Sequence, residues 1–332
     1  MLLAALLVTV RMLALPEHAT IDPFGPRPLM AVSRSGAVAA TATFAGFRTR
    51  PIVWNSSGTA RVIEVTGSIA GFDRDGGLFI NADRPLRFSG SRPRPLDLGT
   101  CEAFPHDSAG SLLAGQLDDG ALIATMRSPA LVDLDDTSGQ NAPVVLYLRS
   151  GLCLNEGNGI ATATNGAYAA GYMSTINNVP SPSNVVSSSE RFTALRWHVR
   201  VREPLGRGVP LAVNAAGSAA GADVPPARGA AFAVTPHARL WPSPGQVVDV
   251  VSGNTLSVAY AIDDRGRVAG MLQDGGRHYA FLWRNGTLVR LDDVADKPGW
   301  RFECAYAFAP GGGIVGVGTY DGRAEAFELY GL

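Results

Sequence analysis

The side chains of this chain that could do chemistry are scattered along it. None of the five histidines forms the i, i+4 pair that holds a metal on a helix, and the three cysteines lack the paired spacing of a zinc site. No serine stands in a Gly-x-Ser-x-Gly turn, and the one lysine, Lys297, lies far from any phosphate-binding loop. We therefore expect no catalytic residues and a non-enzymatic protein.

An enzyme is the alternative, and a lyase or hydrolase acting on polysaccharide or peptide would suit this kind of chain. Such an enzyme needs carboxylate, histidine and arginine side chains that converge on one pocket. The residues that could converge are His106, Asp107, Asp263, Asp264 and Arg265. Because we place them in turns on the face opposite the long insertions described below, we expect no shared pocket.

Acidic residues offer one candidate for metal binding. Asp118 and Asp119, with the acidic run at 133–136, could donate oxygen ligands to calcium. They lack the alternating aspartates and distal glutamate of an EF-hand loop. We expect no cofactor and no metal, with calcium as the alternative.

Composition narrows the partners and the location. The net charge is −1, from 28 basic and 29 acidic residues, so there is no broad basic field and we expect no nucleic-acid binding. The apolar start is short and broken by Arg11, which argues against a membrane span. We predict a signal peptide at 1–19, one domain at 20–332, an extracellular or periplasmic location and a monomer.

A repeat supplies the elements that would position these residues. In the clearest copy, 259–291, the turn sequences Asp-Asp-Arg-Gly, Asp-Gly-Gly and Asn-Gly separate four short runs, which predicts a four-stranded antiparallel meander. A first glycine recurs at a mean interval of about 46 residues, which is near the length of one propeller blade. Its positions are Gly36, Gly67, Gly110, Gly166, Gly217, Gly266 and Gly312. A second glycine follows four or five residues later in every repeat except the first, which has Ala40.

The repeat also predicts how the sheets pack. Both alternating faces of 279–283 are apolar, so both faces of the sheet should be buried. Small residues such as Ala259 and Ala269 fill the first two strands, whereas Phe281 and Trp283 lie in the third, a taper that suits sheets converging on an axis. We predict an all-β protein, a seven-bladed β-propeller of four-stranded antiparallel meanders, with six or eight blades as alternatives. We expect residues 20–24 to supply the last strand of the final blade.

The repeat resembles the bacterial extracellular HAF repeats, named for a His-Ala-Phe motif. The pattern Ala-x-Asx-x-x-Gly-x-Val-x-Gly, followed by Ala-Phe-x-Trp and Asn-Gly, is complete at 259–291, where the motif reads His278-Tyr279-Ala280-Phe281. Partial copies extend from about residue 20 to the end. The resemblance implies an exported bacterial protein, and it carries no catalytic residues to transfer.

Three consecutive repeats are longer than the others, and we place the extra residues between their second and third strands, at 116–141, 172–193 and 222–237. Such connections would emerge on one face, and loops on a rigid scaffold are a usual place for function. The alternative is a set of disordered surface loops. We predict a ligand face that binds an unknown glycan, peptide or protein. Its candidate residues are Asp118, Asp119, Tyr172, Asn177, Asn178, Arg191 and Arg228.

Overall fold

The structure of the chain is a computed structural model. It describes residues 8–21, 30–46, 48–72, 75–82, 86–95, 112–113, 121–127, 141–147, 152–155, 160–165, 167–179, 187–198, 201–223, 235–253, 255–295 and 297–332.

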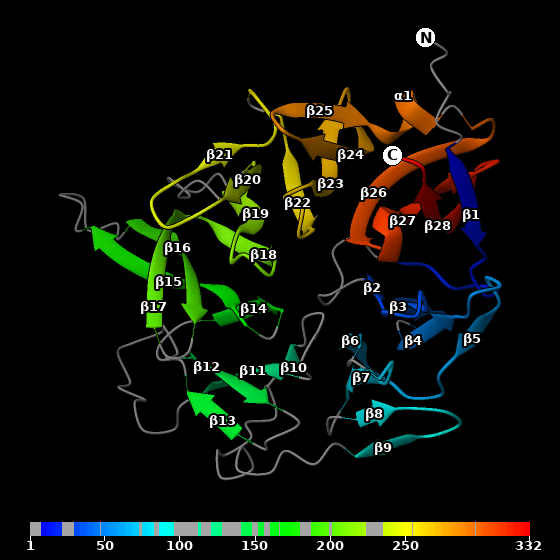
Figure 1. Cartoon of the computed structure of the whole chain (residues 1–332), viewed down its shortest axis with the longest axis horizontal. Coiled ribbons are helices and arrows are strands. Elements are labelled where there is room, and N and C mark those ends of the chain that lie inside the picture. The colour runs from blue at the N-terminus through cyan, green and yellow to red at the C-terminus, as the bar shows by residue number, and fades with distance from the viewer. Residues whose placement is uncertain are drawn as a thin grey trace. The chain divides into compact units, whose positions relative to one another are not determined.

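Four-stranded antiparallel sheets repeat along the chain, as the glycine spacing predicts. The described residues form seven such sheets (Figure 1). Three of them are β2 (Met30–Val32), β3 (Val38–Phe44), β4 (Arg48–Trp54), β5 (Ala60–Val62); β6 (Ser68–Phe72), β7 (Leu78–Asn81), β8 (Leu86–Phe88), β9 (Pro93–Pro95); and β10 (Leu112–Leu113), β11 (Ala121–Arg127), β12 (Asn141–Tyr147), β13 (Leu152–Asn155).

Three more sheets follow the same order. They are β14 (Ile160–Thr164), β15 (Ala169–Val179), β16 (Ser187–His198), β17 (Val201–Arg207); β18 (Val209–Val213), β19 (Ala219–Asp223), β20 (His237–Trp241), β21 (Val248–Asp249); and β22 (Ser257–Ile262), β23 (Val268–Asp274), β24 (Arg277–Arg284), β25 (Thr287–Arg290). After the short helix α1 (Leu291–Ala295), the last sheet combines β26 (Trp300–Phe308), β27 (Ile314–Tyr320) and β28 (Arg323–Tyr330) with β1 (Thr9–Leu13) from the start of the chain.

The chain divides into two compact units, which we describe separately. One unit comprises residues 1–96 and 267–332, and the other comprises residues 97–266. The first contains the sheets β2–β5 and β6–β9, the sheet of β1 and β26–β28, and strands β23–β25. The second contains the sheets β10–β13, β14–β17 and β18–β21, and strand β22. Among the described residues, no helix is long and apolar enough to cross a membrane.

The sheet at 257–290 confirms the predicted meander almost residue for residue. Asn285 and Gly286, with φ of 50° and 82°, lie between β24 and β25, while Gly275 and Gly276, with φ of 55° and 77°, lie between β23 and β24. Positive φ at both central residues is the type I′ geometry whose twist matches that of the flanking strands. The turn residues therefore set the register of this sheet.

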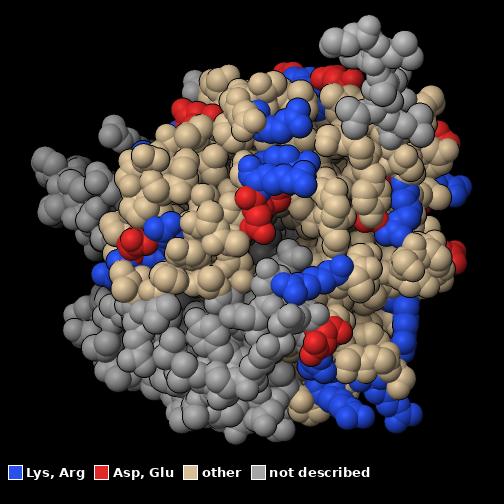
Figure 2. All heavy atoms as spheres, viewed as in Figure 1, with Lys and Arg blue, Asp and Glu red and all other residues tan. Residues whose placement is uncertain are grey.

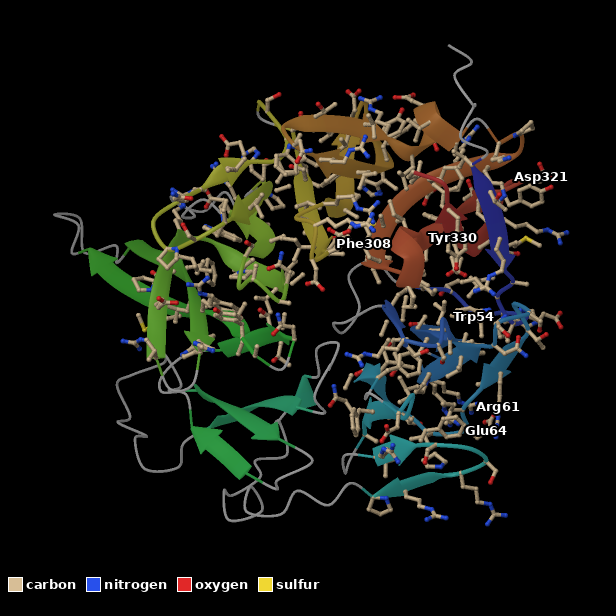
Figure 3. The ribbon with its side chains drawn as sticks, in the orientation of Figure 1. Trp54, Arg61, Glu64, Phe308, Asp321 and Tyr330 are labelled. Carbon is tan, nitrogen blue, oxygen red and sulfur yellow. The ribbon has the colours of Figure 1, made fainter. Side chains whose placement is uncertain are left out.

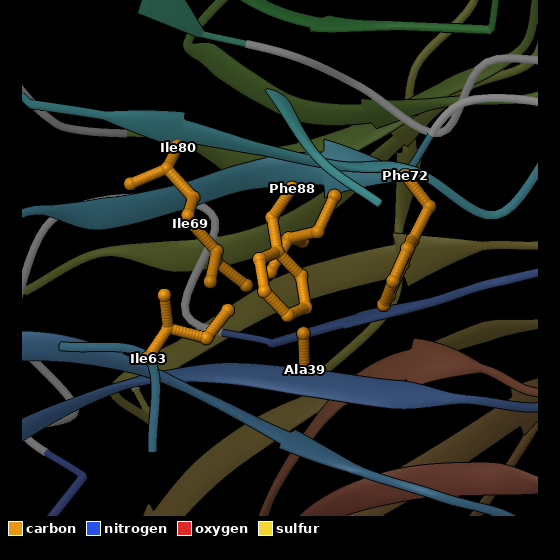
Figure 4. Packing of buried hydrophobic residues seen from close by; sticks show 7 residues of the cluster. Ala39, Ile63, Ile69, Phe72, Ile80 and Phe88 are labelled. Atoms are coloured by element: carbon orange, nitrogen blue, oxygen red, sulfur yellow. The ribbon is translucent and has the colours of Figure 1, made fainter. Parts of the chain in front are cut away.

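Both faces of strand β24 are buried, as its apolar run predicts. Residues Ala280 to Trp283 of β24 are all buried, which leaves neither alternating face wet. The same is seen between the sheets β2–β5 and β6–β9, where Ala39 of β3 and Ile63, which follows β5, pack against Ile69 and Phe88 of the other sheet (Figure 4). Of the six largest fully buried aromatic side chains among the described residues, five lie on third strands, at Trp54, Trp197, Trp241, Phe281 and Phe327, and the sixth, Phe302, lies on the first strand β26. The predicted taper from small to large residues is thus confirmed in five sheets, with Phe302 as an exception.

The second glycine of the repeat stands where two backbones approach closely. Gly221 of β19 faces a β-bulge in β18, and Gly316 of β27 faces a bulge in β26. A Cβ on Gly316 would overlap the carbonyl oxygen of Cys304, and one on Gly221 would overlap that of Val209. The first repeat has Ala40 at this position, and a side chain can be accommodated there because the β2–β3 ladder around Ala40 has no register shift.

In two repeats, the first glycine makes room for an arginine from the preceding repeat. Arg196 of β16 donates a hydrogen bond of 2.8 Å to the carbonyl of Gly217, and Arg267 donates one of 3.1 Å to that of Gly312. A Cβ on either glycine would collide with the arginine that reaches it. Both glycines also have positive φ. Glycine at these two positions therefore has two roles: it allows the positive φ of the turn, and it leaves room for the arginine that links neighbouring sheets.

Three details of the predicted repeat are wrong. One is the placement of the insertion at 116–141 between a second and a third strand, because the second strand β11 lies inside that range. The strand that completes the last sheet is Thr9–Leu13 and not residues 20–24, because β1 forms the ladder with β28 while Thr20 makes only an isolated bridge to Thr43. In the second repeat, Gly67 and Gly71 lie at the first strand, and Gly76, with φ of 81°, is in the first-to-second-strand turn. Glycine pairs occur at close backbone approaches as well as at turns. Glycine spacing alone therefore assigned Gly67 to the turn that Gly76 occupies, one strand too early.

The close approach at Gly316 predicts a large effect of a single methyl group. We expect Gly316→Ala to lower the free energy of unfolding by about 2 kcal/mol or more, because the fixed carbonyl of Cys304 must move. The matched control Ala40→Gly should cost only about 1 kcal/mol, from backbone entropy. Urea denaturation measures both. Equal effects of the two substitutions would contradict the assigned role of the glycine.

Candidate ligand-binding face

The insertion at 172–193 forms a long hairpin and not the loop expected from its composition. In the ladder of β15 and β16, Ser174 to Val179 pair with Phe192 to Ser187, while the flanking strands end opposite Tyr172 and Thr193. Six residue pairs therefore extend beyond the neighbouring strands. We call residues 174–179 and 187–192 the hairpin arm. Strand β15 ends at Val179, just before Pro180 in the sequence, and proline cannot donate a hydrogen bond to a ladder.

Two aromatic side chains lie where the arm leaves the sheet. Tyr172 and Phe192, on adjacent strands, are half-buried and meet edge to face, with ring centroids 5.5 Å apart. This arrangement suits the quadrupoles of the two rings. Because both rings remain partly exposed, they offer an apolar surface at the base of the arm.

A chain of ion pairs begins at the same end of the sheet. The carboxylate of Asp223, whose side chain is only 12% exposed, accepts a hydrogen bond of 2.7 Å from Nε of Arg207 and one of 3.2 Å from Arg239. Arg239 also pairs with Asp249 on the next strand. Since Arg207 is the register partner of Thr193, the chain of ion pairs lies beside the base of the hairpin arm.

Arg207 is the member of this chain that faces solvent. Its side chain is 47% exposed, and its bond to Asp223 uses Nε. The two terminal nitrogens take no part in this bond, and the bond holds the guanidinium in one orientation. Such a group can donate two parallel hydrogen bonds to a carboxylate or sulfate. The described part of this face therefore combines aromatic edges with an oriented cation.

The structure brings together four of the seven predicted site residues. Tyr172, Asn177 and Asn178 lie on β15 and Arg191 on β16, with Asn177 opposite Ser189 and Thr175 opposite Arg191. They are strand residues, so the loop assignment for them is wrong. Asp118, Asp119 and Arg228 lie outside the described residues, as does the acidic run at 133–136.

The remaining candidates have structural partners where they are described. Asp263 accepts a hydrogen bond from the backbone N–H of Arg265, and Asp264 accepts one from that of Ala215. These carboxylates cap turns. His106 and Asp107 lie outside the described residues. In the described part of the chain, no group of three or more His, Cys, Asp or Glu residues could hold a metal ion.

Sequence reasoning missed Arg207, Asp223 and Arg239, because they belong to two repeats and no motif links them. It also missed Glu303 in the other unit. Glu303 lies on β26, and partial burial raises the pKa of its carboxyl, while the nearby His278 and Arg301 act in the opposite direction. A carboxyl with a raised pKa beside a histidine is a pattern found in acid–base sites as well as in structural clusters.

Comparisons with solved structures give the fold. The chain resembles the β-propeller domain of the Trilobed protease from Pyrococcus furiosus, with a TM-score of 0.57, 12% identity, and 95% of this chain and 94% of that one covered. It also resembles a puromycin hydrolase, with a TM-score of 0.58 and 13% identity, covering 96% of this chain but only 54% of the hydrolase. The polysaccharide lyase Uly1 matches with a TM-score of 0.53 and 9% identity, at 94% and 91% coverage.

These likenesses confirm the predicted fold class. The protein is an all-β protein of the β-propeller class, built from four-stranded antiparallel meanders. No protein-family model matches the chain, and no curated protein matches it either. Identities this low show the fold and not the activity.

The buried carboxylate of Asp223 should matter more than its exposed counterpart. We expect Asp223→Ala to cost about 2 kcal/mol, because it removes the buried carboxylate that Arg207 and Arg239 share and leaves only the exposed Asp249 to pair with Arg239. The control Asp249→Ala, at a side chain 61% exposed, should cost less than about 0.5 kcal/mol. Thermal unfolding of both variants measures the difference. A larger loss for Asp249→Ala would reverse the proposed order of the ion pairs.

Proposed function

We propose that the protein is a non-enzymatic binding propeller that acts outside the cytoplasm and holds a glycan, peptide or protein on the face that carries the hairpin arm. The observation that carries the proposal is the paired arm rising beside an oriented arginine. An extracellular or periplasmic location follows from the resemblance of the 259–291 repeat to HAF repeats.

The arm is better suited to binding than a flexible loop of the same length. Its backbone is already paired in a ladder, so less conformational entropy is lost when a ligand orders it. Tyr172 and Phe192 can contact the apolar face of a sugar or side chain, while Arg207 can bind an acidic group. The proposed ligand therefore carries a carboxylate or sulfate.

Figure 2 supports a local rather than a global role for charge. Among the described residues on the face shown, basic and acidic side chains occur in small groups of both signs. A surface of this kind does not attract polyanions over long distances. Recognition would then depend on the few oriented groups at the base of the arm.

A glycan and peptide array on the purified protein, followed by affinity measurement on two variants, tests the proposal. In the first, Asn-Gly replaces residues 176–190, so that the register partners Thr175 and Arg191 are joined by a two-residue hairpin turn. The second is Arg207→Gln. We expect each to weaken binding by about tenfold or more, which is about 1.4 kcal/mol.

Arg202→Gln is the matched control, because Arg202 is an exposed arginine on the same strand, at the end away from the arm. It should leave affinity unchanged. An array without any saturable ligand, or a ligand that binds the shortened arm as tightly as the natural one, would exclude this face as the binding site.

Cleavage of an acidic polysaccharide is a second candidate, which the raised pKa of Glu303 beside His278 favours. A carboxylate in such surroundings could accept a proton in an elimination reaction. Assay of the wild-type protein for unsaturated sugar ends tests it. Product that appears with the wild type and disappears in Glu303→Gln would support an enzyme, and intact polysaccharide with both would exclude it.

A further inference from the structure

The start of the chain is an integral strand of the last sheet. Strand β1 pairs with β28 through five consecutive register partners, from Thr9 opposite Tyr330 to Leu13 opposite Ala326. These residues lie inside the segment 1–19 that composition predicts as a signal peptide. A segment removed on export cannot also complete a sheet of the mature protein.

The pairing has an electrostatic reason. The carboxylate of Glu328 is fully buried, and its described partners are the guanidinium of Arg11 and the hydroxyl of Tyr330, which donates to it. Burial and the negative charge of Glu328 raise the pKa of Tyr330 to about 12. The hydroxyl therefore stays protonated at neutral pH, and the cation that balances the buried charge comes from β1.

Further contacts hold the same segment against two sheets of one unit. Leu13 is fully buried, and Arg11 also donates to the carbonyl of Ser56. The carbonyl of Ala14 accepts a hydrogen bond of 2.9 Å from the indole of the buried Trp54, and the N–H of Leu15 donates one of 2.9 Å to Glu325. In Figure 3, Trp54 and Tyr330 lie on the two neighbouring sheets that this segment contacts.

We infer that residues 9–15 are retained in the mature protein and serve as the strand that closes the last sheet. Cleavage after residue 19 would leave Glu328 buried without its cation, remove the acceptor of Trp54 and open the edge of β28. If the protein is exported with proteolytic processing, the cut falls before Thr9. The edge of β28 is thus a binding site for this chain's own first strand.

Truncation tests the inference independently of any ligand. We expect a chain starting at residue 8 to melt at the temperature of the full chain, and a chain starting at residue 20 to melt several degrees lower. A synthetic peptide of residues 8–16 should restore the lost stability when added to the shorter chain. A peptide carrying Arg11→Met should restore much less, and one carrying Met12→Gln, at an exposed side chain, should act as the natural one does.

Full-length variants cover the case in which the shorter chain does not fold. Arg11→Met should lower the melting temperature, and adding Glu328→Gln should recover part of the loss because it removes the unpaired charge. Met12→Gln is again the control. Intact mass of the exported protein gives the mature N-terminus directly. A mature protein beginning at residue 20, or equal melting temperatures for the two truncated chains, would overturn the inference.

Discussion

Burial of both faces of a sheet by its neighbours is the constraint on which the rest of the structure depends. Within a sheet, the second-strand glycines Gly221 and Gly316 stand where a bulge of the first strand leaves no room for a Cβ. The largest buried aromatic side chains lie mainly on third strands. At two first-turn glycines, Gly217 and Gly312, an arginine of the preceding repeat binds the carbonyl and joins neighbouring sheets.

What could be predicted from the sequence was local. Asn285-Gly286 and Gly275-Gly276 define their own turns, so the sheet at 257–290 followed from residue types alone. The arm could not be found in this way, because its serine-rich strands carry no apolar alternation and their pairing is visible only in the ladder of β15 and β16. Arg207 and Asp223 meet because two repeats are neighbours, which no short motif encodes.

The closing strand was misplaced for a related reason. An apolar run near the start of a chain has the composition of both a signal peptide and a buried strand. The distinguishing residue is Arg11, whose partner Glu328 lies 317 residues away. A charge that interrupts the apolar run argues against a membrane span, and in the folded protein the same charge neutralises a buried carboxylate.

The hairpin arm extends beyond the four-stranded part of its sheet. Neither β14 nor β17 runs beside the two strands of the arm. The arm can therefore contact a ligand while the four-stranded part of the sheet stays packed. In strands β15 and β16, the residues inside the four-stranded sheet contribute to stability, and the residues of the arm are the ones proposed to bind a ligand. Function in this propeller would then depend on what extends past the packed sheets.

Native-state hydrogen exchange tests the central claim most directly. If both faces of each sheet are buried, the amides of β23 and β24 should exchange only through global unfolding, while those of the arm exchange through openings of much lower free energy. Equal protection of the arm and of β23 and β24, or fast exchange throughout β23 and β24, would contradict the account.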